Sequence, residues 1–132
     1  MGFLTKAQIL AVEDIPTQEV DVPEWGGKVM VRGLTAGQRG RFTETIVDQR
    51  GKKNVIRLQD IQIRLCMMTI VDPISSKRLF EEADMKALGE KSGAALERVS
   101  KAAQVLSGLS DEDVEELTKN SEAIQSEDSL LD

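Results

Sequence analysis

The pattern of apolar and polar positions along the chain predicts a mainly helical protein. The strongest signal covers residues 54–72, where apolar side chains recur at helical spacing before Asp72-Pro73 ends the helix. They form two neighbouring stripes, one of Leu58, Ile61, Leu65 and Met68 and the other of Ile56, Ile63, Met67 and Ile70. A helix that is apolar around so much of its circumference either lies at the centre of the core or exposes one stripe to a partner.

Further helices are predicted from residues that can cap a helix. Thr5 and Thr35 each stand three positions before a Gln, which is the spacing of a capping box. Asp84 and Ser92 are the expected caps of a short helix and of a longer one that Gly108 closes. The predicted ranges are 6–13, 35–48, 84–90 and 93–107, and a last small helix begins at Ser110.

Residues 17–33 alternate apolar with polar side chains and predict a β-hairpin. One face carries valines and is expected to rest on helices, because an isolated hairpin is marginally stable. The other face pairs acidic residues of the first strand with basic residues of the second. Trp25 at the tip either folds back as a lid on the core or protrudes as an interface anchor.

These elements predict an α+β fold, a predominantly helical single domain with an N-terminal β-hairpin packed on helices, plus an acidic C-terminal tail. The domain is expected to span residues 1–109, followed over 110–132 by the short acidic helix and a disordered tail. The net charge of −6 supports this division, because residues 110–132 hold nine acids against one base. The rest of the chain therefore carries a net charge of +2.

The composition argues against catalysis and against a metal or cofactor site. The chain has no His, no Tyr and one Cys, which excludes Ser–His and Cys–His dyads, imidazole ligands and disulfides. Cys66 lies inside the most apolar helix and is expected to be a core residue. The carboxylates at Glu81, Glu82 and Asp84 lack the ligand spacing of a calcium loop. No catalytic residue, cofactor or metal is predicted, and no apolar run is long enough to span a membrane.

A basic segment over residues 32–64 leaves two interpretations open. It holds eight bases against three acids, and such an excess can bind the phosphates of a nucleic acid in a small regulator. The overall acidic charge disfavours nucleic acid, however. A solvated face, or a docking surface for an acidic partner or for the protein's own tail, is the favoured interpretation.

Several blocks of the sequence resemble the tail assembly chaperones of long-tailed, siphovirus-type bacteriophages. The resemblance covers roughly residues 5–109, and residues 110–132 show no matching pattern. The blocks keep their order and are KAQILAVED, EVDVPEWGGKVMVRGLTAGQRGRF, CMMTIVDP and KRLFEEADMKALGEKSGAALERV.

The resemblance implies a non-enzymatic assembly factor that acts in the host bacterial cytoplasm and is not expected in the mature virion. Such a protein binds the tape measure protein, keeps it soluble and promotes tail tube assembly around it. A longer form made by ribosomal frameshifting recruits the tail tube protein in many of these phages, and the family tends to self-associate. A structural tail-completion or connector subunit is the alternative within the same particle.

Five residues are predicted to contact a partner or a second copy of the chain. Trp25 is chosen for its place at the hairpin tip, and Arg39 and Arg41 for their place on the capped helix over 35–48. Met67 and Met68 are chosen because methionine adapts to irregular apolar surfaces.

Overall fold

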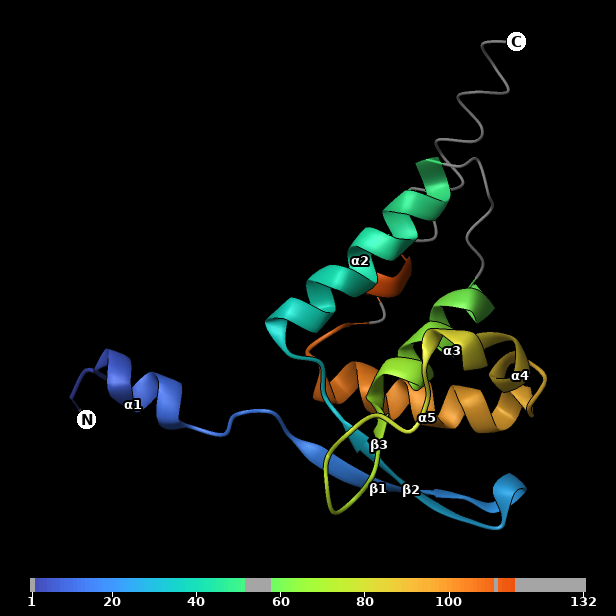
Figure 1. Cartoon of the computed structure of the whole chain (residues 1–132), viewed down its shortest axis with the longest axis horizontal. Coiled ribbons are helices and arrows are strands. Elements are labelled where there is room, and N and C mark those ends of the chain that lie inside the picture. The colour runs from blue at the N-terminus through green and yellow to red at the C-terminus, as the bar shows by residue number, and fades with distance from the viewer. Residues whose placement is uncertain (1, 52–57, 111, 116–132) are drawn as a thin grey trace, which may run out of the picture.

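The structure is a computed structural model that describes residues 2–51, 58–110 and 112–115. The start of the helix predicted over 54–72, part of the basic segment over residues 32–64 and the predicted disordered tail lie outside these residues. The elements are, in order, α1 (Lys6–Ala11), β1 (Thr17–Val22), the 3₁₀ turn η1 (Pro23–Trp25), β2 (Gly27–Arg32), α2 (Ala36–Gly51), α3 (Leu58–Thr69), β3 (Ile70–Val71), the 3₁₀ turn η2 (Glu82–Asp84), α4 (Met85–Gly89) and α5 (Gly93–Leu106). The predicted α+β fold with a hairpin packed on helices is confirmed (Figure 1).

The predicted hairpin forms. Strands β1 and β2 pair antiparallel with Val20 opposite Val29, and the valine face is turned toward the core, where Val20 is buried. On the other face the ammonium group of Lys28 lies 2.9 Å from the carboxylate of Glu19, diagonally across the two strands. The predicted pairing of acidic and basic side chains is therefore present on the exposed face.

The sheet has a third strand that the sequence pattern assigned to a helix. Helix α3 ends at Thr69, and Ile70 and Val71 form β3, which pairs antiparallel with β2. The prediction of a helix to residue 72 is wrong at this end, because two consecutive β-branched residues suit a strand and an exposed sheet edge lies within reach. The Asp72 carboxylate then accepts hydrogen bonds from the backbone of Ile74 and Ser75, both at 2.9 Å. Those bonds lower its pKa and form the turn.

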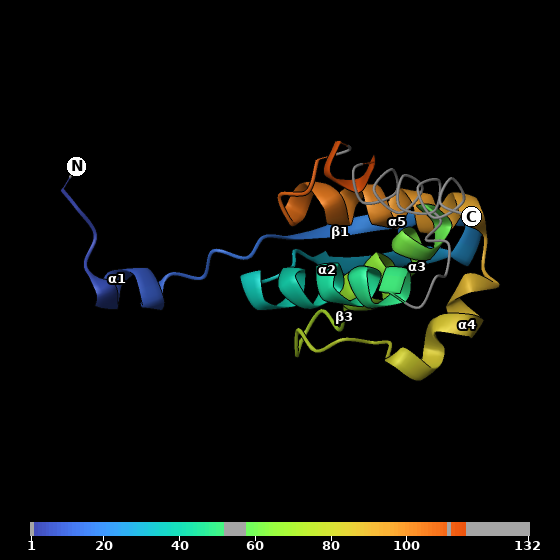
Figure 2. The ribbon, with the colours of Figure 1, turned by 90° about the horizontal axis from the view of Figure 1, so that it is seen from above.

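Helices α3 and α5 pack side by side, and α5 also covers β1 and β2 (Figures 1 and 2). The predicted inward face of α5 is confirmed, with Ala95, Leu96, Val99 and Ala103 buried. Ile61 and Leu65 of α3 are 1% and 0% exposed. Of the two interpretations of the doubly striped helix, the structure therefore supports the one that places it at the centre of the core.

The local capping predictions are mostly confirmed. The two capping boxes at Thr5 and Thr35 form, and the Ser92 hydroxyl accepts a hydrogen bond from the backbone of Ala95 at 3.2 Å. The expectation for Asp84 is wrong, because its carboxylate accepts the backbone N–H of Glu81 at 2.7 Å and so caps η2 instead of α4. Two helix ends also differ: α1 stops at Ala11, and α2 continues through Gly51.

Helix α1 stands apart from the rest of the molecule. An extended segment over residues 12–16 joins it to β1 and carries it away from the sheet (Figure 2). No residue of α1 is buried. We call residues 2–16 the N-terminal arm.

Candidate functional site

Three of the five predicted contact residues meet at one small cavity. Arg41 of α2 and the adjacent Met67 and Met68 of α3 line it, and its volume is about 160 Å³. That volume corresponds to roughly five water molecules at ~30 Å³ each, enough for one apolar side chain. The remaining lining residues are Thr45, Arg64, Arg78 and Glu82. We call this the methionine cavity.

The rim of the methionine cavity carries an excess of positive charge. The Arg64 side chain is 11% exposed and makes a two-point contact with the carboxylate of Glu82, at 3.0 and 2.8 Å. Hydrogen bonds from Arg64 lower the pKa of Glu82, so this carboxylate stays charged and neutralises Arg64. Among the described residues Arg41 and Arg78 form no ion pair. They leave the rim suited to an acidic side chain of a partner.

The two methionines lie beneath this rim. Met67 is 2% exposed and Met68 is 6% exposed, so neither presents a free side chain on the surface. The expectation that they contact a partner stays a prediction, and it requires the partner to reach them through the methionine cavity. Flexible thioether side chains can rearrange around such an incoming group.

Trp25 lies at a second, larger cavity formed at the hairpin tip. We call this the tryptophan cavity. Its volume is about 490 Å³, within the range of about 300–1,000 Å³ that is common for ligand pockets. Its lining residues are Glu24, Trp25, Phe80, Asp84, Ala87, Leu88 and Lys91. The half-buried ring of Trp25 packs on the core, as the lid interpretation predicts, and it also forms a wall of this cavity. Contact of Trp25 with a partner stays a prediction.

Two further features concern the surroundings of Trp25, namely the ion pair of its neighbour Glu24 and its own indole N–H. The Arg98 guanidinium donates a hydrogen bond of 2.8 Å to Glu24, which fastens η1 to α5. The backbone N–H of Glu24 and that guanidinium lower the pKa of the Glu24 carboxyl. Among the residues that the structure describes, no acceptor lies within hydrogen-bond distance of the buried indole Nε1–H of Trp25. A buried donor without an acceptor lowers stability.

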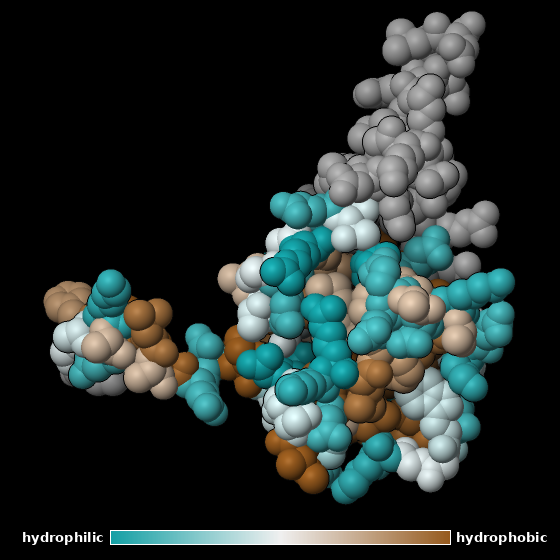
Figure 3. Space-filling view, viewed as in Figure 1, coloured by the Kyte–Doolittle hydropathy of each residue, from teal (hydrophilic) through white to brown (hydrophobic). Residues whose placement is uncertain are grey.

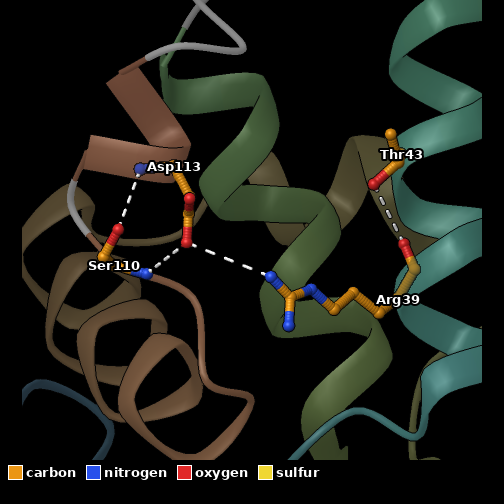
Figure 4. A network of polar contacts seen from close by, with 4 residues as sticks. All are labelled: Arg39, Thr43, Ser110 and Asp113. Atoms are coloured by element: carbon orange, nitrogen blue, oxygen red, sulfur yellow. Dashed lines mark hydrogen bonds and ion pairs between the residues drawn. The ribbon is translucent and has the colours of Figure 1, made fainter.

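Arg39 lies away from both cavities, beside the start of the acidic C-terminal region (Figure 4). One of its guanidinium nitrogens is 4.0 Å from the Asp113 carboxylate. That carboxylate also accepts the backbone N–H of Ser110 at 2.9 Å, and the Ser110 hydroxyl accepts that of Asp113 at 3.0 Å. The bonds to Ser110 lower the pKa of Asp113. Arg39 of the basic segment therefore lies beside the start of the protein's own acidic end, and docking of the acidic tail on this segment stays a prediction.

The sequence predictions missed the residues that complete both cavities. Arg64 and Glu82 are 18 positions apart and carry no local signal of their contact. Phe80 and Leu88 lie in a segment predicted as a turn and a short helix, yet they form the apolar lining opposite Trp25. The opposite charges of Arg64 on α3 and Glu82 after β3 are a weak sequence signal that could have suggested their contact.

Cys66 is confirmed as a core residue. Its side chain is fully buried, and its Sγ–H donates to the backbone carbonyl of Leu96 at 3.4 Å. Burial raises the pKa of the thiol to about 12, so the thiolate that would act as a nucleophile is scarce at neutral pH.

We expect Cys66 in the folded protein to be unreactive toward Ellman's reagent, with labelling becoming rapid once guanidinium chloride unfolds the chain. The measurement is the release of the coloured thiolate at pH 8 with and without denaturant. Rapid stoichiometric labelling of the folded protein would contradict the burial of this side chain.

The geometry of the described residues indicates the general class of this protein. The tryptophan cavity has a mainly apolar lining, whereas the methionine cavity is lined mostly by charged and polar side chains above Met67 and Met68. In the part that the structure describes no group of three or more metal-ligating side chains comes together. None of the helices in the described ranges is long and apolar enough to cross a membrane. These features fit a small protein-binding domain.

The comparison with known families identifies which class of binding domain this is. The family of phage tail assembly chaperones matches residues 5–120. The chain belongs to this family. The match extends beyond residue 109, where the resemblance seen in the sequence ends. Neither the curated proteins nor the solved structures give a significant match.

Family membership establishes the general function of the protein. The protein is a phage tail assembly chaperone, and the family indicates a role with tail proteins during assembly in the host cell.

Proposed function

We propose that the chain binds the tape measure protein of its phage, keeps it soluble and promotes assembly of the tail tube around it. The observation that carries this proposal is the family match over residues 5–120. A longer frameshifted form recruits the tail tube protein, and the chaperone leaves before the virion is complete.

The methionine cavity supplies the binding chemistry for this task. A tape measure protein is a long helical polypeptide, and amphipathic helices dock by placing apolar side chains into grooves. One apolar side chain fits the cavity above Met67 and Met68. Acidic side chains one turn away on the docked tape measure helix then reach Arg41 and Arg78 at the rim.

The experiment is a pull-down of tape measure protein co-expressed with a tagged copy of the full chain. Arg41→Glu places a negative charge on the rim, and we expect it to reduce the captured tape measure protein at least about tenfold. Arg41 is exposed, so the fold is unaffected, which circular dichroism checks.

Lys86→Glu is the matched control, because Lys86 is exposed on α4 and lines neither cavity. Equal capture by the two variants would contradict binding through the methionine cavity, and no capture by the wild-type chain would contradict the proposed function. Mass spectrometry of purified virions separates the proposal from a structural tail-completion subunit, since such a subunit stays in the particle.

A further inference from the structure

The rim of the methionine cavity carries two arginines that form no ion pair with any described residue. They are Arg41 of α2 and Arg78 after β3, and both side chains are exposed. The other arginine of the lining, Arg64, is already held by the Glu82 carboxylate at 2.8 Å. Helix α2 presents mainly hydrophilic side chains around this rim (Figure 3). The cavity therefore suits one apolar side chain that has carboxylates close to it in the sequence.

A segment of the chain outside the described residues has this pattern. Residues 127–132, which we call the leucine segment, read Glu-Asp-Ser-Leu-Leu-Asp. The two adjacent leucines supply the apolar side chains, and all three carboxylates stand within three positions of a leucine. The segment contains no basic residue. It is therefore complementary to the cavity in polarity and to the rim in charge.

The described structure places the start of the acidic region beside α2. Val114 is 4% exposed and belongs to the core, and the neighbouring Asp113 carboxylate lies 4.0 Å from Arg39. Arg39 and Arg41 are two positions apart on α2, so they point to different faces of this helix. The leucine segment begins twelve residues after Glu115, and twelve residues reach about 40 Å when extended. A helix with its side chains is about 10–12 Å wide, so the chain is long enough to pass around α2 to the methionine cavity.

We propose that the leucine segment occupies the methionine cavity of its own chain. A leucine side chain lies above Met67 and Met68, and the neighbouring carboxylates pair with Arg41 and Arg78. The connecting residues favour this contact, because they hold the segment near the cavity at an effective concentration on the order of millimolar. An incoming helix must displace the segment before it binds, so the contact regulates the cavity. The regulation rests on the proposed function, whereas the occupancy needs the chain alone.

The test of the occupancy is a disulfide between the leucine segment and the cavity. Ser129→Cys places a thiol beside the leucines, and Thr45→Cys places a thiol in the lining of the cavity. Thr43→Cys is the matched control on α2. Thr43 and Thr45 each donate a hydrogen bond to the carbonyl four residues earlier, and Thr43 lines neither cavity. Cys66 is the single native cysteine, and its burial keeps it out of the exchange.

Each variant with two introduced cysteines is equilibrated in a glutathione buffer at low protein concentration. Mass spectrometry then measures the fraction of chains that hold an internal disulfide. We expect the equilibrium constant for the pair at positions 45 and 129 to exceed that for the pair at positions 43 and 129 at least about tenfold. The double substitution Leu130→Asp and Leu131→Asp should reduce this ratio by removing the apolar contact. Salt at about 1 M should also reduce it by screening the exposed charges.

Three outcomes would overturn the proposed occupancy. The first is an equal equilibrium constant for the two pairs of positions. The second is a ratio that neither the leucine substitutions nor salt reduces. The third is a disulfide that forms mainly between two chains, because the segment would then occupy the cavity of another copy. No tape measure protein is present in this test, so its failure is distinct from failure of the proposed function.

The regulation is measured in the pull-down of the tape measure protein. The full chain with Leu130→Asp and Leu131→Asp should capture about tenfold more of this protein than the wild-type chain, because the cavity is no longer covered. Ile124→Asp is the control, since Ile124 is an apolar residue of the tail outside the leucine segment, and it should leave capture unchanged. Equal capture by the leucine variant and the wild-type chain would overturn the regulation. No capture by either chain would contradict the proposed function.

Discussion

Replacing Phe42 with Ala is expected to lower the free energy of unfolding by about 4 kcal/mol. Phe42 is 1% exposed, and it is the one buried side chain among residues 36–45 of α2. The loss combines the transfer of an aromatic ring to water with the cavity left behind. Because this ring fastens the described part of α2 to the core, the same change should also displace Arg41 from the methionine cavity.

Chemical denaturation in urea, followed by circular dichroism, measures this loss. Thr43→Ala is the matched control, because Thr43 is the next residue of α2 and its side chain is exposed. Its hydroxyl donates to the backbone carbonyl of Arg39 within the same helix. We expect the control to change stability by less than about 0.5 kcal/mol. If Phe42→Ala unfolded at the same urea concentration as Thr43→Ala, α2 would not be held to the core through this ring.

Replacing Gly33 with Ala is expected to cost about 3 kcal/mol. A methyl group at this position would overlap the backbone carbonyl of Leu106 at the end of α5. Neither backbone can move away easily. The N–H of Gly33 donates to the carbonyl of Pro16 at 2.9 Å, and the N–H of Leu34 donates to the buried hydroxyl of Ser107 at 2.9 Å.

Gly40→Ala is the control for this second substitution. Gly40 lies within α2, and apart from the neighbouring backbone of the helix itself no described atom lies within 4 Å of where its methyl group would be. Ala there should raise stability by roughly 0.5–1 kcal/mol, because Gly is the weaker helix former. The two Gly→Ala substitutions are thus expected to have opposite signs in the same denaturation experiment, and a neutral Gly33→Ala would contradict the close approach of β2 to α5.

Local features of the fold could be predicted from the sequence because their partners are near in the chain. The capping boxes at Thr5 and Thr35 depend on residues three positions away, and the hairpin follows from the alternation of valines. Strand β3 could not be predicted, because its two residues continue the apolar pattern of α3 and their pairing with β2 depends on a segment about 40 positions earlier.

The candidate site could be predicted in part. Arg41 was chosen for a different reason from Met67 and Met68, and the fold brings all three to one cavity. The contact between Arg64 and Glu82 that completes its rim depends on the tertiary structure. For the arm, the sequence gives the apolar residues Leu4 and Ile9, but a pattern cannot say whether the rest of the chain covers them.

The proposed function is tested most directly by the soluble fraction of the tape measure protein expressed with and without this chain. After lysis and centrifugation, we expect the tape measure protein to move from the pellet to the supernatant when the full wild-type chain is present, and to co-purify with it. A tape measure protein that stays in the pellet while the chain purifies alone would contradict the proposal that this chaperone binds it and keeps it soluble.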